Sequence, residues 1–199
     1  MASALVPTVV ALADDQNWRV RELVLKQVAS VVRVLKSNSQ QELLGACIGA
    51  LTDRVASIRV AAVESLTALA EHNGSSFVQT QILGKASQLI EKSQNYSQRV
   101  TYVQLIGAVA GVMPDRAFVQ SALWPVLLRA ANDKVPNVRM TAARLIKNLA
   151  SSGKLFEDSS PASREYDSVI KKLELDADVD VRDALVAANR SGDVAVNQD

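Results

Sequence analysis

The sequence predicts an all-α protein: an α-solenoid, or superhelix, of about five repeats that each consist of two antiparallel helices. The first observation is the composition. Ala, Val and Leu dominate the 199 residues, while there are only 8 Gly, 5 Pro and 4% aromatic side chains, a mixture that favours helices. The second is an internal repeat, because a single helical pair cannot bury both of its faces and must stack on others.

The repeat is visible when residues 5–29 are aligned with residues 123–150, because Pro7 and Pro125 each stand eight residues before an aspartate. In both segments an arginine follows that aspartate by six residues. The same spacing recurs along the chain, with a serine in place of the aspartate in the third repeat. The resulting pairs are Asp15/Arg21, Asp53/Arg59, Ser93/Arg99, Asp133/Arg139 and Asp176/Arg182.

Each repeat is expected to hold one helix before the aspartate position and a second helix after a tight turn. The second helices are recognised by apolar residues 13 and 16 positions after the aspartate, an i, i+3 pair that marks a buried stripe. These pairs are Val28 and Val31, Leu66 and Leu69, Ile106 and Val109, and Ile146 and Leu149. The predicted helices span 3–14 and 17–36, 39–52 and 55–72, 76–92 and 96–112, 116–132 and 136–151, and 162–175 and 179–189.

Loops between repeats are expected where proline, glycine and serine gather, at 72–76, Pro114, 151–154 and Pro161. One domain is therefore predicted over 1–190, with repeats at about 3–37, 38–74, 75–114, 115–153 and 160–190. The last repeat has Asn189 and Gly192 at the positions of the buried stripe. Residues 191–199 are accordingly expected to form a disordered tail.

The repeated aspartates and arginines are expected to build a structural ladder between neighbouring turns. The guanidinium fork of arginine matches either a carboxylate or the carbonyl groups of a turn. The carboxylates follow the period of the repeat and are not paired, so general acid–base catalysis is not predicted. The ladder residues are Asp15, Arg21, Asp53, Arg59, Arg99, Asp133, Arg139, Asp176 and Arg182.

The residue three positions after each aspartate position is expected at the solvated tip of the turn. These residues are Trp18, Ala56, Tyr96, Pro136 and Val179, whereas turns ordinarily favour Gly, Asn, Asp or Ser. A row of apolar and aromatic tips predicts a contact ridge for a protein partner, since Trp and Tyr are enriched at interface hot spots. The alternative is that Trp18 and Tyr96 pack locally onto their own helices.

Composition argues against several other classes of function. With 22 basic and 21 acidic residues, the chain lacks the positive surplus on which binding to nucleic acid or to an anionic membrane rests. A single cysteine, Cys47, and a single histidine, His72, argue against a zinc cluster, a disulfide framework and a catalytic triad. We therefore expect no enzyme, cofactor or metal, and no nucleic-acid or membrane partner. The lack of a signal segment or long apolar run predicts a cytoplasmic protein, with the nucleus as a second location.

The proline in the first helix and the phrase D-x-x-x-x-V-R across the turn resemble the HEAT-repeat family over essentially the whole chain. Within that family, the chain is similar to the C-terminal five repeats of the scaffolding A subunits (regulatory subunits A) of protein phosphatase 2A. The similarity lies in DDQNWRVRE (14–22), LTDRVASIRVAA (51–62), QNYSQRVT (94–101), ANDKVPNVRMTAARLIKNL (131–149) and KLELDADVDVRDAL (172–185).

The resemblance implies a non-catalytic scaffold whose turns hold the catalytic subunit of a serine/threonine phosphatase. A B-type regulatory subunit would bind repeats that this chain lacks. The second turn departs from the family pattern, which leaves Ala56 and Ser57 doubtful as contacts. The implied partner-binding residues are Asn17, Trp18, Arg19, Asn95, Tyr96, Pro136, Asn137, Val179 and Asp180.

The first helix is apolar on nearly all sides, where a terminal repeat should have a polar outer face. Scaffolds of the family also have a longer array of repeats. We expect either a C-terminal fragment of a longer scaffold or a short protein whose open end associates with another copy. The apolar residues of this helix are Leu5, Val6, Val9, Val10 and Leu12.

An importin-like or other HEAT adaptor is the rival function. Such a protein binds a peptide segment along its concave second helices instead of its turns. That surface should be acidic or lined with Asn and Trp, whereas the second helices here carry basic residues and no repeated Asn or Trp. The basic residues are Lys26, Arg33, Lys36, Arg144 and Lys147.

Overall fold

The computed structural model describes residues 2–32, 37–90, 93–155 and 161–187, and these ranges are helical with no strand. The predicted all-α solenoid fold is confirmed, because each repeat is a pair of helices that stacks on the next pair within its unit. The chain divides into two compact units, residues 1–115 and 116–199. The predicted tail over 191–199 lies outside the described residues.

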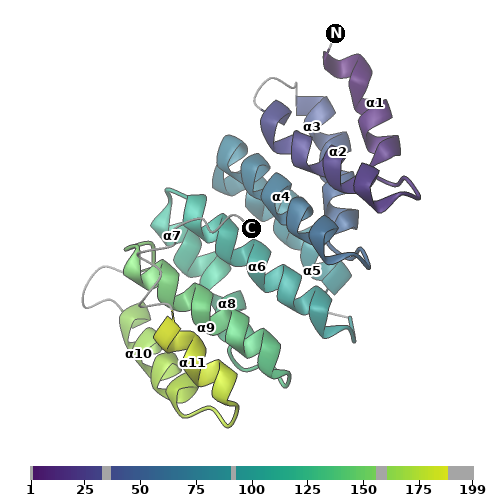
Figure 1. The fold of residues 1–199 in the computed structure, drawn as a ribbon. Helices are drawn as coiled ribbons and strands as arrows, with labels where there is room; N and C mark the ends of the chain where they lie inside the picture. Colours follow the sequence, from purple (N-terminus) through teal and green to yellow (C-terminus); the bar gives the residue numbers. More distant parts are fainter. Residues whose placement is uncertain (1, 33–36, 91–92, 156–160, 188–199) are drawn as a thin grey trace. The chain divides into compact units, whose positions relative to one another are not determined.

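The first unit contains the first three repeats. The second helices of these repeats, α2 (Trp18–Val31), α4 (Ala56–Phe77) and α6 (Tyr96–Val112), lie side by side in one layer (Figure 1). The first helices form the other layer, where α1 (Ala2–Leu12) packs against α3 (Ser37–Ala50). The third of them consists of the π-helical turn η2 (Val78–Leu83) and α5 (Gly84–Ile90), which packs on α6.

The second unit contains the fourth and fifth repeats. Its first helix is built from α7 (Arg116–Phe118), the π-helical turn η3 (Val119–Leu123) and α8 (Trp124–Ala130). The second helix of the fourth repeat is α9 (Pro136–Ser151), and the fifth repeat consists of α10 (Pro161–Glu174) and α11 (Val179–Ala187). α9 packs against both α8 and α11 (Figure 1).

Aliphatic side chains of the second helices form the core of each unit. The predicted buried stripe is confirmed at Val28, Leu66, Leu69, Ile106, Val109, Ile146 and Leu149, each at most 5% exposed. The prediction is wrong for Val31, which is 36% exposed. Val31 lies on the side of α2 that faces away from α4, and no described helix pair packs there.

The boundary between the second and third repeats is a single glycine. The loop expected at 72–76 is not formed. Instead, Gly74 alone interrupts the helical backbone inside α4, with φ 80° and ψ −176°. This combination is essentially restricted to glycine, because any side chain clashes with the backbone there. The chain therefore changes direction without a loop, and the following residues resume a helix.

We expect Gly74→Ala to lower the free energy of unfolding by about 1–3 kcal/mol, the cost of holding a side chain in this region of φ and ψ. Gly84→Ala is the matched control, because Gly84 has a helical φ of −61° and should gain about 0.5–1 kcal/mol. A Cβ at either position meets no atom within 4 Å, so only the backbone conformation differs. Urea unfolding measures both values, and equal effects would contradict the assignment of strain to Gly74.

Two π-helical turns were not predicted. Both end ten residues before the aspartate position, at Leu83 and Leu123. In the fourth repeat the wider turn comes just before Pro125, whose ring and missing N–H disturb the hydrogen bonds of the preceding turn. Lys85 stands at the corresponding place in the third repeat, so proline accounts for only one of the two.

Candidate partner-binding site

The five turns share one hydrogen-bonding pattern. The side-chain oxygen at the aspartate position accepts the backbone N–H of the residue two positions later. This bond ties the turn to its own side chain and places the next residue at the start of the second helix. The acceptors and the N···O distances are Asp15 (2.7 Å), Asp53 (2.8 Å), Ser93 (3.1 Å), Asp133 (2.8 Å) and Asp176 (3.0 Å).

An arginine closes each turn from the other side. Its Nη1 donates to the backbone carbonyl of the residue at the aspartate position, six residues earlier. The five arginines are Arg21, Arg59, Arg99, Arg139 and Arg182. The backbone of each turn is therefore ordered before any partner binds, which lowers the entropic cost of binding.

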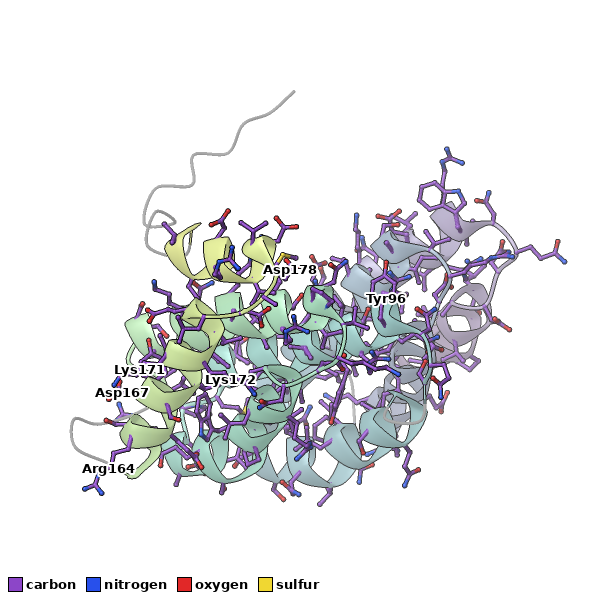
Figure 2. The ribbon with its side chains drawn as sticks, turned by 90° about the horizontal axis from the view of Figure 1, so that it is seen from below. Tyr96, Arg164, Asp167, Lys171, Lys172 and Asp178 are labelled. Atoms are coloured by element: carbon purple, nitrogen blue, oxygen red, sulfur yellow. The ribbon has the colours of Figure 1, made fainter. Side chains whose placement is uncertain are left out.

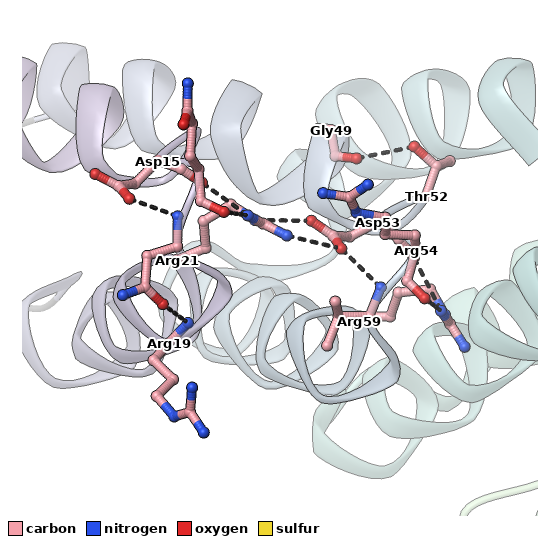
Figure 3. Close-up of polar contacts among 11 residues, drawn as sticks. Asp15, Arg19, Arg21, Gly49, Thr52, Asp53, Arg54 and Arg59 are labelled. Atoms are coloured by element: carbon pink, nitrogen blue, oxygen red, sulfur yellow. Dashed lines mark hydrogen bonds and ion pairs between the residues drawn. The ribbon is translucent and has the colours of Figure 1, made fainter.

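Two of these arginines also join one repeat to the next. In unit 1, Arg21 donates Nε and Nη2 to the two carboxylate oxygens of Asp53, at 3.0 and 3.3 Å (Figure 3). In unit 2, Arg139 makes the same pair of bonds to Asp176, both at 2.7 Å. All four side chains are at most 16% exposed. These ion pairs are rungs of a ladder between adjacent turns.

The third repeat modifies the ladder because it has Ser93 in place of aspartate. Nε of Arg59 donates instead to the hydroxyl of Thr101, at 3.1 Å. Gln98 adds a further link, since its amide donates to the backbone carbonyl of Thr52 at 3.3 Å. Gln98 also pairs with the hydroxyl of Ser93. Gln98 stands where the other four repeats have Val or Ile before the arginine, and its compensating role was not predicted from the sequence.

The rung between Arg139 and Asp176 has an electrostatic signature. The hydrogen bond from Arg139 holds the pKa of Asp176 below its ordinary value of 3.8, and partial burial opposes that shift. The same bond raises the pKa of Arg139. Asp176 is thus ionised over the whole neutral range and into mild acid.

Each second helix starts at the predicted turn tip. We call these first residues, with the flanking residues that the resemblance implied, the turn edge of each unit. In unit 1 the turn edge contains the aromatic side chains Trp18 and Tyr96, which are 37% and 47% exposed, and the exposed Ala56. Trp18 and Tyr96 are therefore partly open to solvent. Tyr96 is labelled in Figure 2. The remaining unit 1 members are Asn17, Arg19 and Asn95.

The two asparagines of the turn edge cap helices. Asn17 accepts the backbone N–H of Arg19 at 3.1 Å, and Asn95 accepts that of Ser97 at 3.0 Å. Both are N-cap bonds of the kind that stabilises helix starts. The guanidinium of Arg19 lies 4.6 Å from the centre of the Trp18 ring, a cation–π contact. Trp18 is thus oriented by its neighbour and still exposed.

In unit 2 the turn edge is formed by the fourth and fifth repeats. Val179 is 53% exposed, Asn137 and Asp180 are exposed, and Pro136 is half-buried. Asp178 lies in the turn before α11 (Figure 2), where its carboxylate accepts the backbone N–H of Asp180 at 2.9 Å. Leu175, one residue before the aspartate position, is 85% exposed and was missed by sequence reasoning.

The basic residues of the second helices are partly engaged. Lys26 pairs with Glu22 on its own helix at 2.8 Å, and Lys147 donates to the backbone carbonyl of Leu185. Arg144 is exposed. Arg33 and Lys36 lie outside the described residues.

Cys47 and His72 differ in their surroundings. Cys47 is fully buried, and desolvation raises the pKa of its thiol to about 12, so it is not a reactive thiolate. His72 is exposed at the surface of α4. Among the described residues, no three His, Cys, Asp or Glu side chains are grouped to hold a metal ion. Within the same ranges, no helix is long and apolar enough to cross a membrane.

Comparison with protein families matches the HEAT repeat to residues 43–73 and 123–153, in the second and fourth repeats. Two similar solved structures are designed armadillo repeat proteins. The first was computationally designed for modular peptide recognition. It has a TM-score of 0.47 and 20% sequence identity, and the alignment covers 96% of this chain and 82% of the designed chain. The second has a TM-score of 0.42 and 15% sequence identity, and the alignment covers 94% of this chain and 99% of the designed chain. No curated protein matched the sequence.

Proposed function

We propose that this protein is a non-catalytic scaffold that binds the catalytic subunit of a protein phosphatase 2A-type serine/threonine phosphatase along its turn edge. A protein-interaction role fits a repeat solenoid of this kind. The observation that carries the proposal is the exposure of apolar and aromatic side chains at the first residue of successive second helices. An interface needs such anchors on a backbone that is already ordered.

The phosphatase is the partner suggested by the sequence motifs of all five turns. Of the residues implied by that resemblance, all but the half-buried Pro136 are exposed, which supports their availability to a partner. Trp18 is the strongest single anchor, because it combines a large ring with the cation of Arg19. Asn17 and Asn95 serve mainly as helix caps, so we expect their contribution to a partner to be indirect.

The mechanism is positional. A scaffold supplies no acid, base or metal but raises the effective concentration of an enzyme near its targeting subunit. Binding of a B-type regulatory subunit through further repeats, and a cytoplasmic or nuclear location, belong to the same proposal.

Calorimetry with a purified phosphatase 2A-type catalytic subunit tests the assignment. We expect the wild-type chain to bind and Trp18→Ala to weaken binding by about 2 kcal/mol, about thirtyfold in the dissociation constant, as for an aromatic hot spot. Val60→Ala is the matched control, because Val60 is 47% exposed on the surface of α4 and not on the turn edge. It should bind like wild type.

Each other outcome has a defined meaning. Absence of binding by the folded wild-type chain would reject the phosphatase as partner. Loss of binding with Val60→Ala but not with Trp18→Ala would move the site to the second helices, as in a peptide adaptor. Circular dichroism should show the same helix content for both variants.

A further inference from the structure

A groove of about 320 Å³ lies between α1 and α3, near the ends of both helices. Val10 and Asp14 line it on the side of α1, and Gly45, Ala46 and Gly49 line it on the side of α3. Both walls belong to described helices of unit 1 that pack on each other (Figure 1), so neither wall depends on residues outside the chain. The volume is at the lower end of the range for ligand sites, about 300–1,000 Å³, and suits a single side chain.

Two glycines of α3 keep this groove open. Gly45 and Gly49 are spaced by four residues and therefore lie on one face of the helix. A Cβ added at either position meets no atom within 4 Å, so packing does not require glycine there. Glycine inside a helix is also less stable than alanine. The two glycines thus leave a space that the fold itself does not use.

The corresponding groove of unit 2 is crossed by a lysine. Lys172 stands four residues before the aspartate position of the fifth repeat, and it is labelled in Figure 2. Its ammonium donates to the side-chain oxygen of Asn132, one residue before the aspartate position of the fourth repeat. The same two positions in the second and first repeats are Gly49 and Asp14. The repeats after the second have large side chains where it has Gly49, namely Leu89, Arg129 and Lys172.

The groove of unit 1 has a carboxylate where the lysine ammonium of unit 2 finds an amide oxygen. Asp14 is exposed, and its carboxylate forms no hydrogen bond or ion pair with the described residues. Asp53, the other carboxylate of the lining, is held by Arg21. No basic side chain is among the described residues that line the groove. α1 and α3 also end beside it, and the carbonyl ends of helices favour a cation.

We propose that this groove binds a lysine side chain from a basic segment of a partner protein. The aliphatic stem of that lysine lies across Gly45 and Gly49, and its ammonium pairs with the carboxylate of Asp14. Lysine suits such a place because its stem can be buried along apolar surface while its charge stays in water. The pairing reproduces, between two chains, the contact that Lys172 and Asn132 make within unit 2.

NMR titration of the full 199-residue chain, isotope-labelled at nitrogen, tests the proposal. The probe is the blocked peptide acetyl-Gly-Ala-Lys-Ala-Gly-amide. A matched peptide has norleucine in place of lysine, which keeps the stem without the charge. We expect the lysine peptide to shift the amide signals of Asp14, Gly45 and Gly49 saturably, and the norleucine peptide to bind about threefold more weakly. Absence of a saturable shift at these three amides would overturn the proposal.

Two substitutions locate the binding. Asp14→Asn removes the carboxylate and should reduce the affinity for the lysine peptide to that for the norleucine peptide. Gly49→Lys places a lysine at the position of Lys172 and should abolish binding, because its own side chain fills the groove. Asp14 and Gly49 are both exposed, and a Cβ at Gly49 meets no atom, so both variants should fold. Circular dichroism checks that the helices are retained.

Each variant has a control with the same charge change outside the groove. Glu42→Gln removes an exposed carboxylate of α3, and Gly84→Lys adds a lysine at a helical glycine with open space around its Cβ. Both should bind the lysine peptide like wild type, since neither residue lines the groove. Loss of binding with either control would contradict the assignment, as would full affinity of Asp14→Asn or Gly49→Lys. No turn-edge residue lines the groove, so this result is independent of phosphatase binding.

Discussion

Leu66→Ala is expected to lower the free energy of unfolding by about 2–5 kcal/mol, the largest effect of any single substitution proposed for this protein. Leu66 is fully buried in α4, the helix that packs against α2, α3 and α6. Truncation removes the transfer free energy of the side chain and leaves a cavity that three neighbouring helices cannot easily fill. Urea unfolding followed by circular dichroism measures the loss.

A matched control on the same helix separates the effect of the cavity on the free energy of unfolding from the effect of the changed helix propensity. Val60→Ala removes aliphatic atoms from a side chain that is 47% exposed, so it should change the free energy of unfolding by less than about 0.5 kcal/mol. Equal losses for the two variants would show that α4 is not the centre of the core of unit 1.

Arg139→Met is expected to destabilise unit 2 by about 2–4 kcal/mol at neutral pH. The methionine keeps the aliphatic stem but removes the guanidinium, which leaves the carboxylate of Asp176 without its cation at 10% exposure. Removing one partner of a buried pair costs more than the pair contributes, because the other charge stays desolvated. Residual contact of Asp176 with solvent keeps the expected loss below the upper limit for fully buried pairs.

The loss should depend on pH with a definite sign. Arg139 lowers the pKa of Asp176 in the folded protein, so this contribution to stability is present above the ordinary pKa of 3.8. It disappears as the pH falls through the lowered value, where Asp176 becomes protonated. The difference between wild type and Arg139→Met should therefore be constant from pH 5 to 8 and shrink below about pH 4.

Native-state hydrogen exchange of amides in α9 and α11 measures this effect within unit 2. A double-mutant cycle with Asp176→Asn isolates the pair from the other bonds of Arg139, including the one to the carbonyl of Asp133. A coupling free energy near zero, or a difference that persists unchanged at acid pH, would mean that the rung adds no net stability.

Much of the fold is predictable from the sequence because each repeat is specified by interactions between residues that lie close together in the chain. The aspartate, the arginine six residues later and the apolar pair beyond them indicate a turn followed by a helix with one buried face. The helix starts follow closely. The predicted starts at 96, 136 and 179 are observed, and those at 17 and 55 lie one residue before the observed starts at Trp18 and Ala56. The glycine and serine of 72–76 mark the boundary between the second and third repeats, although they predict a loop where only Gly74 leaves the helical conformation.

Other features depend on contacts between repeats and could not be predicted. Val31 belongs to the apolar pattern, yet it is exposed because burial requires a neighbouring helix pair and not only a periodic sequence. Arg59 follows an aspartate by six residues, as Arg21 does, but its Nε bonds Thr101, since the next repeat offers a serine instead of an aspartate. In the sequence Gln98 only departs from the repeat pattern, whereas in the structure it bonds Ser93 and the backbone carbonyl of Thr52 and so links the second and third turns.

The sequence by itself thus determined the helices, their turns and the identity of the residues at the turn edge. Only the tertiary structure decided which of these side chains are exposed and which arginine reaches which carboxylate. The physical reason is the separation along the sequence over which each interaction acts. Capping and periodicity act within a few residues, whereas the hydrogen bonds and ion pairs of the repeat arginines join positions 32 to 42 residues apart.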